Sequence, residues 1–162
     1  MRVRFCSEQE AVSIIPSQSM ALISITNPGD TAPVMDGWGK VLRIAFADAT
    51  YGEREIKFFD RMWYISSQGF FTKTHAIAIR DFLDTLDQTI DLVVHCGAGQ
   101  SRSVAVAMYA AEKLGVPLDG DVSRHNVTVL QLLNNPCLFD SILPATQESA
   151  SLWATMKQFC NS

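Results

Sequence analysis

Residues 95–103 read HCGAGQSRS, and this stretch decides how the rest of the chain is interpreted. The residues before it, DLVV at 91–94, are mostly apolar and predict a buried strand that delivers Cys96. The residues after it, 103–114, carry apolar side chains at helical spacing, and Gly115 marks the predicted end of that helix. The stretch is therefore predicted to turn from a strand into a helix.

This turn combines features that suit a bound phosphate group. Amides at a helix N-terminus lack intrahelical partners and lie at the positive end of the helix dipole, so they attract an anion. Gly97 and Gly99 allow successive amides to point inward, and the Arg102 guanidinium can bind two phosphate oxygens at once. The same field stabilises a thiolate, so we expect Cys96 to be ionised at neutral pH. A lone cysteine or a glycine pair is an ordinary structural feature, but their combination with Arg102 predicts a phosphate cradle with a nucleophile at its base.

The chain here resembles the cysteine-dependent protein tyrosine phosphatases, in their compact dual-specificity-like branch. The pattern of that family is His-Cys-x5-Arg-Ser/Thr, and residues 95–103 match it completely. The chain is similar in particular to small single-domain phosphatase-like proteins of bacteria and phages, because ALISITNPGD (21–30), VLRIAFAD (41–48) and HAIAIRDFL (75–83) occur in the expected order. The resemblance covers roughly residues 20–135, although only the loop is highly specific.

The resemblance implies a role for each residue of the loop. Cys96 attacks phosphorus and forms a phosphocysteine, which water then hydrolyses. The loop amides and the guanidinium hold the phosphate oxygens, which assigns phosphate binding to Gly97, Ala98, Gly99, Gln100, Ser101 and Arg102. His95 orients the loop and supports the thiolate. Ser103 donates a hydrogen bond to the sulfur and so makes it a better leaving group in the second step.

The reaction also needs a general acid, which the family places on a loop after an earlier strand. Asp48 directly follows the predicted strand 41–46 and is the first choice for this role. It lies farther from Cys96 than in most compact members, because residues 49–71 look inserted. Asp60 is the alternative, with Glu53 and Glu55 behind it, although surface carboxylates are often only solvated charges.

The segment 51–71 is the part of the chain least similar to the family. It is rich in aromatic residues, which are Phe58, Phe59, Trp63, Tyr64, Phe70 and Phe71. These rings suit a lid that contacts an aryl phosphate, core packing against the sheet, or a surface for a partner. Core packing is the favoured interpretation for most of them.

Asn126 precedes a predicted helix with an apolar stripe of Val127, Leu130 and Leu133. The resemblance implies that Asn126 reaches back to brace the phosphate loop, and asparagine is equally suited to be the N-cap of this helix. His75 and His125 have no partners at metal-ligand spacing, so no metal and no cofactor is predicted.

The global properties predict a small cytoplasmic enzyme. A chain of 162 residues suits one domain, here 1–162. A net charge of −4 argues against nucleic acid as a partner, and no apolar run approaches the roughly 20 residues that span a membrane. The four cysteines show no disulfide or zinc pattern, which predicts a reducing compartment.

The predicted fold is a three-layer α/β sandwich with a central, mostly parallel sheet. Strands are expected at 13–15, 21–26 and 41–46, followed by a helix at 74–86, the strand before Cys96 and three further helices. The last of these helices is expected at 145–160.

Residues 97–101 carry no charge, which favours a singly phosphorylated substrate such as phosphotyrosine in a protein, or a small phosphomonoester, over highly anionic substrates. Activity towards phosphoserine and phosphothreonine stays open. Two alternatives also stay open. One is a rhodanese-like sulfurtransferase, which uses a cysteine in a similar loop. The other is a phosphate-binding module that lacks an effective acid and does not turn over.

Overall fold

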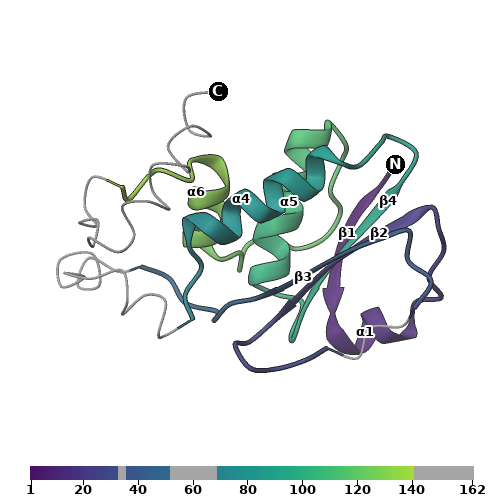
Figure 1. Ribbon diagram of the computed structural model, residues 1–162, viewed down its shortest axis with the longest axis horizontal. Helices are drawn as coiled ribbons and strands as arrows, with labels where there is room; N and C mark the ends of the chain where they lie inside the picture. Colours follow the sequence, from purple (N-terminus) through teal and green to yellow (C-terminus); the bar gives the residue numbers. More distant parts are fainter. Residues whose placement is uncertain (33–35, 52–68, 141–162) are drawn as a thin grey trace.

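The computed structural model describes residues 1–32, 36–51 and 69–140 (Figure 1). Its elements along the chain are β1 (Val3–Ser7), α1 (Glu8–Ser13), β2 (Met20–Thr26), β3 (Lys40–Ala45), α4 (Lys73–Asp84), β4 (Asp91–Cys96), α5 (Arg102–Leu114) and α6 (Val127–Asn134). The four strands form one parallel sheet in the order β1-β4-β2-β3. The α/β class and the parallel sheet are therefore as predicted.

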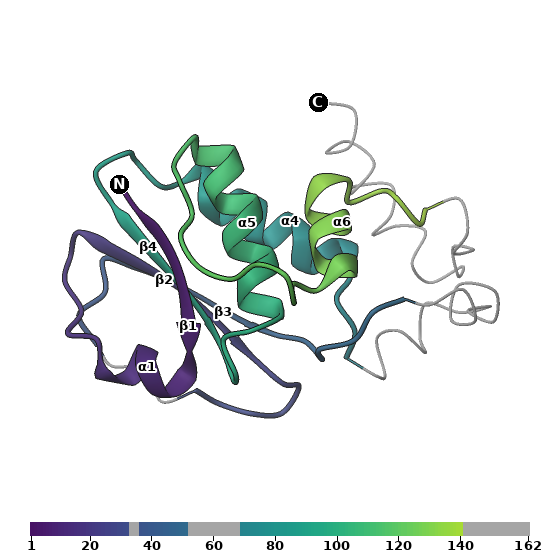
Figure 2. The same cartoon turned by 180° about the vertical axis from the view of Figure 1, so that it is seen from behind.

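Helices lie on both faces of this sheet. Figures 1 and 2 show α4, α5 and α6 together on one face and the short α1 on the other. The side chains of β2 alternate accordingly, because Ala21, Ile23 and Ile25 belong to the main core, whereas Leu22 packs with Trp38 and Val93 in a smaller cluster. The larger helical layer therefore covers the main core, and α1 covers the smaller cluster.

The predicted strand at 13–15 is wrong. Those residues end α1 and follow it, and the first strand is instead β1, at Val3–Ser7. Ser7 accounts for the difference, because it caps α1 through a reciprocal pair of hydrogen bonds with Glu10. The charged run at residues 8–10 is thus the first turn of a helix.

The other predicted elements occur with small shifts in their bounds. Strands β2 and β3 each begin one residue earlier than expected, and α5 ends at Gly115, which adopts the left-handed conformation. Helix α4 ends two residues before the predicted 86, because Thr85 is its C-cap. The stripe predicted for α6 is partly wrong, because Val127 is exposed and the helix buries Thr128, Val129, Leu132 and Leu133. The helix predicted at 145–160 lies outside the described residues.

Among the helices that the structure describes, none is both long enough and apolar enough to cross a membrane.

Candidate active site

Residues 97–101 form the connection between β4 and α5, as predicted. Cys96 is the last residue of β4, which is an inner strand of the sheet, and its side chain is buried. Ser103, in the first turn of α5, is also buried, and its Oγ lies 3.2 Å from Cys96 Sγ. The structure thus places the expected hydroxyl within hydrogen-bond distance of the expected nucleophile.

Residues 97–101, which are predicted to bind phosphate and are called the phosphate loop below, rest against the end of β1. Gly99 has a φ of +71°, a conformation that favours glycine, and a Cβ added there would lie 2.4 Å from the Ser7 nitrogen. The Glu8 amide donates to the Gly97 carbonyl at 3.2 Å. The junction between β1 and α1 therefore forms a wall behind the loop, and only a residue without a side chain fits at position 99.

Arg102 is anchored by the ends of two strands. Its Nη1 donates to the Thr26 carbonyl at 3.1 Å and to the Phe46 carbonyl at 2.6 Å. The residue is only 6% exposed, and its Nε has no hydrogen-bond partner within the described part of the chain. Nη2 lies 4.0 Å from the position that a Cβ on Gly97 would occupy. Nη1 is thus fixed by the protein, Nη2 lies near the start of the loop, and the buried Nε stays unpaired within the described residues.

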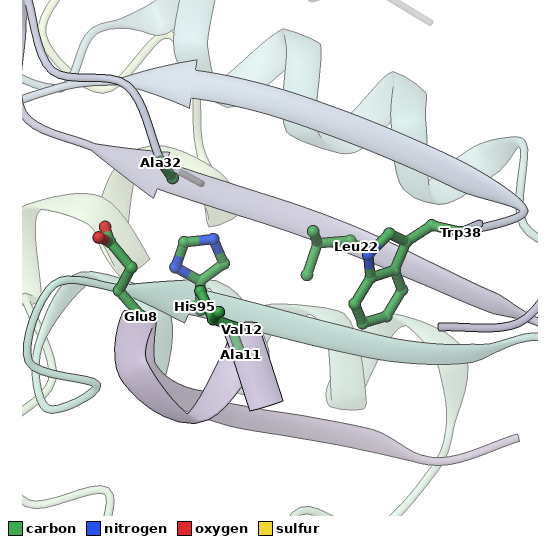
Figure 3. Close-up of a pocket in the computed structure, with 7 residues that line it drawn as sticks. All are labelled: Glu8, Ala11, Val12, Leu22, Ala32, Trp38 and His95. Atoms are coloured by element: carbon green, nitrogen blue, oxygen red, sulfur yellow. The ribbon is translucent and has the colours of Figure 1, made fainter. Parts of the chain in front are cut away.

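His95 lies on the face of the sheet opposite the main core. Its Nε2 is 2.8 Å from Ser24 Oγ, and its Nδ1 has no hydrogen-bond partner among the described residues. Figure 3 shows the imidazole in a small pocket between Glu8 of α1 and Leu22 of β2. Burial lowers the pKa of His95, the charge of Arg43 lowers it further, and the Cys96 backbone acts in the opposite direction. The imidazole is therefore neutral at neutral pH.

Asp48 reaches the phosphate loop, although it is far from it in sequence. Its Oδ1 accepts hydrogen bonds from Ser101 Oγ at 2.7 Å and from Asn126 Nδ2 at 2.8 Å. The carboxylate is exposed to solvent. The structure thus brings the first-choice acid to the last residue of the loop, whereas Asp60, Glu53 and Glu55 lie outside the described residues.

Asn126 is the N-cap of α6, because its side chain accepts from the Val129 amide at 3.0 Å. Its contact with the phosphate loop is made by the backbone, whose N–H donates to the Ser101 carbonyl at 3.3 Å. The carboxamide Nδ2 instead turns to Asp48 and to the Ala49 carbonyl. The predicted N-cap role of Asn126 is thus confirmed, whereas the contact formed by its carboxamide Nδ2 runs to the segment that carries Asp48.

The two ends of the aromatic segment 51–71 pack into the protein. Phe71 is fully buried and contacts Phe46 at a ring-centroid distance of 4.7 Å. The Tyr51 hydroxyl donates a hydrogen bond to the Phe71 carbonyl, and the Tyr51 ring centroid lies 5.1 Å from that of Phe139. Core packing is therefore correct for Phe71, while Phe58, Phe59, Trp63 and Tyr64 lie outside the described part of the chain.

The other histidines and cysteines have separate surroundings. His75 accepts from the Thr72 amide at the start of α4, and His125 Nδ1 lies 2.8 Å from the Val122 carbonyl. No group of three or more His, Cys, Asp or Glu side chains suited to a metal occurs among the described residues.

Cys6 and Cys96 are free thiols, but Cys137 takes part in a disulfide, so the expectation of a chain without disulfides is wrong.

Sequence reasoning missed two side chains near the loop. Ser24 is a buried hydroxyl in the otherwise apolar stretch ALISI, and a polar residue at such a position signals a hydrogen-bond partner, here His95. Arg124 donates to Gln100 of the loop at 3.3 Å, and nothing in its local sequence indicated this contact.

A scan against models of protein families and a search of curated proteins each find no match to this chain.

Proposed function

We propose that the protein is a phosphatase of the dual-specificity-like type, which hydrolyses phosphomonoesters through a phosphocysteine intermediate. Phosphotyrosine in proteins is the preferred substrate in this proposal. The observation that carries it is the environment of Arg102, a buried guanidinium whose Nη1 is held by the Thr26 and Phe46 carbonyls. Its Nη2 lies near Gly97 of the loop, and its buried Nε has no hydrogen-bond partner among the described residues. A buried cation with an unpaired donor favours an anion next to it, and a planar guanidinium suits phosphate oxygens.

The mechanism follows from the groups around the loop. The Cys96 thiolate attacks phosphorus while the bond to the leaving oxygen breaks, and Asp48 transfers its proton to that oxygen. The loop amides and Arg102 stabilise the charge on the three equatorial oxygens. Asp48, now a carboxylate, takes a proton from a water molecule that attacks the phosphocysteine. Phosphate is released, and the departing sulfur, with Ser103 Oγ 3.2 Å away, is stabilised as a thiolate.

Hydrolysis of para-nitrophenyl phosphate between about pH 4.5 and 8, with reductant and chelator present, tests the proposal. We expect Cys96→Ser to abolish turnover and Asp48→Asn to lower kcat by about 100-fold and to remove the basic limb of the pH profile. Cys6→Ser is the matched control, because the Cys6 side chain packs with Leu22 and Trp38 on the other face and should leave turnover intact. Turnover by Cys96→Ser, or none by the reduced wild type, would reject the phosphatase.

Alkylation by iodoacetamide adds a measurement that does not need turnover. Burial, and then the nearby Glu10 charge, raise the pKa of Cys6 to about 11, so Cys6 stays a thiol at pH 7 and reacts slowly. We expect the reagent to label Cys96 first and inorganic phosphate to slow that labelling. Protection by phosphate without any turnover would instead support a phosphate-binding module.

A further inference from the structure

Asn126 connects three separate parts of the candidate site. It is only 3% exposed, and its Oδ1 caps α6 through the Val129 amide. Its Nδ2 donates to Asp48 Oδ1 at 2.8 Å and to the Ala49 carbonyl at 3.0 Å, while its backbone N–H donates to the Ser101 carbonyl. All of these groups lie within hydrogen-bond distance of one buried side chain and its amide, so the start of α6, the acid-bearing segment and the phosphate loop are fixed to one another.

The two oxygens of the Asp48 carboxylate have different surroundings. Oδ1 accepts two hydrogen bonds, one from Ser101 Oγ and one from Asn126 Nδ2. Oδ2 accepts none from the residues that the structure describes. A protonated carboxylic acid has one O–H donor, and its carbonyl oxygen is a better hydrogen-bond acceptor than its hydroxyl oxygen. The proton of neutral Asp48 is therefore directed to Oδ2.

We propose that Asn126, together with Ser101, is a positioning residue for the general acid, which holds Asp48 against the phosphate loop with the proton on Oδ2. This inference rests on the proposed phosphatase function. It differs from the role implied by the family resemblance, because the carboxamide acts on the acid instead of bracing the loop. The expected benefit is a proton donor already in place when substrate binds, which lowers the entropic cost of the reaction.

Asn126→Asp separates this role from the folding of α6. Aspartate caps a helix about as well as asparagine, so the bond from the Val129 amide is kept. The exchange removes the Nδ2 donor and sets a second carboxylate against Asp48, where like charges repel. Ser101→Ala removes the other donor to Oδ1. Asn135→Asp is the matched control, because Asn135 caps the opposite end of α6 and its Oδ1 accepts from the Cys137 amide.

Two substrates reveal whether proton transfer is the step affected. Para-nitrophenolate leaves without much help, whereas phenolate, with a conjugate acid of pKa near ~10, as for tyrosine, needs the acid. We expect Asn126→Asp to lower kcat/KM for phenyl phosphate by at least about tenfold and for para-nitrophenyl phosphate by less than about threefold. Ser101→Ala should also lower the ratio of kcat/KM for phenyl phosphate to kcat/KM for para-nitrophenyl phosphate. Asn135→Asp should leave this ratio unchanged. Equal losses on the two substrates, or no loss on either, would overturn the assignment.

The side-chain amide signal of Asn126 in a proton–nitrogen correlation spectrum tests the contact without turnover. Asp48→Ala should shift this signal, because it removes the acceptor of Nδ2, and should leave the side-chain signal of Asn135 in place. An Asn126 side-chain signal that does not shift in the Asp48→Ala variant would overturn the proposal. If Asp48→Ala shifts the signal but the wild type hydrolyses neither substrate, the phosphatase function is rejected and the contact between Asn126 and Asp48 is retained.

Discussion

Arg102 has two tasks that only its side-chain shape allows. Nη1 ties together the ends of β2 and β3 through the carbonyls of Thr26 and Phe46, and Nη2 lies near Gly97 of the loop. A lysine keeps the charge but offers a single nitrogen, which cannot hold both carbonyls and also bind two phosphate oxygens. The residue is therefore both a structural tie and the proposed anion-binding group.

We expect Arg102→Lys to weaken the binding of inorganic phosphate by at least about tenfold, because a bidentate contact is lost. Competitive inhibition of para-nitrophenyl phosphate hydrolysis measures this constant, and calorimetry measures it without turnover. The thermal midpoint should also fall, because two buried carbonyl oxygens lose their donor. Phosphate affinity equal to that of the wild type would contradict the role of the guanidinium.

At the scale of elements, the loop fits closely against β1 because Gly99 has no side chain. Gly99 and Gly115 have nearly the same φ, +71° and +66°, but a Cβ at Gly99 would meet the backbone of β1, whereas nothing lies within 4 Å of a Cβ at Gly115. Gly99→Ala and Gly115→Ala therefore carry a similar cost for placing alanine in the left-handed conformation. They differ in that only the Cβ at position 99 would clash with the backbone of β1.

We expect Gly115→Ala to lower the free energy of unfolding by about 1–2 kcal/mol, the cost of a left-handed alanine, and to keep phosphate binding. Gly99→Ala should lose more stability than this control and should bind phosphate poorly, because the loop must move away from Ser7. Urea unfolding and phosphate titration measure the two effects. Equal losses in the two variants would mean that the close approach has no energetic consequence.

The sequence predicted the elements that carry strong local signals. The apolar strand before Cys96, the glycine that follows α5 and the helix predicted at 74–86 all occur in the structure, and α4 buries Ala76, Ile79 and Leu83. Strand β1 was missed because it is a short strand at the edge of the described sheet and Arg4 interrupts its apolar residues, so its pattern lacks a continuous apolar run. The capping pair of Ser7 and Glu10 was present in the sequence and could have located the start of α1.

The residues of the site divide in the same way: some were predicted from local sequence, and others are set by contacts between segments far apart in the chain. Cys96, Ser103 and Arg102 were predicted from one short stretch. Asp48 was chosen because the family resemblance implies an acid after an earlier strand, and Asp48 follows the strand predicted at 41–46. The contacts of Arg102 with Thr26 and Phe46, and of Arg124 with Gln100, join segments far apart in the chain. Such contacts depend on the order of the strands in the sheet, which no local pattern specifies.

At the scale of the whole molecule, two histidines make stability depend on pH. Burial lowers the pKa of both His95 and His75 in the folded protein. Above the ordinary histidine pKa of about 6.5 both states are neutral, and below it only the unfolded chain takes up these protons readily. Their contribution is therefore complete above about pH 6.5 and is lost as the pH falls.

We expect the free energy of unfolding in urea to fall between about pH 7 and 5, by at most about 1.4 kcal/mol per pH unit for each histidine. His75→Gln should reduce the slope, because glutamine keeps the capping contact with Thr72 but cannot be protonated. A pH-independent free energy, or an unchanged slope in His75→Gln, would show that these histidines do not govern acid stability.

The strand order also has a consequence for how the chain is made. Strands β2 and β3 are hydrogen-bonded neighbours close in sequence, whereas β1, among the strands that the structure describes, pairs with β4 alone, Val3 lying opposite Leu92. During translation β1 emerges from the ribosome long before β4, and it stays unpaired with β4 while most of the described sheet is synthesised. The wall behind Gly99 is built from β1, so the predicted anion cradle is completed only after translation has passed β4 and the phosphate loop.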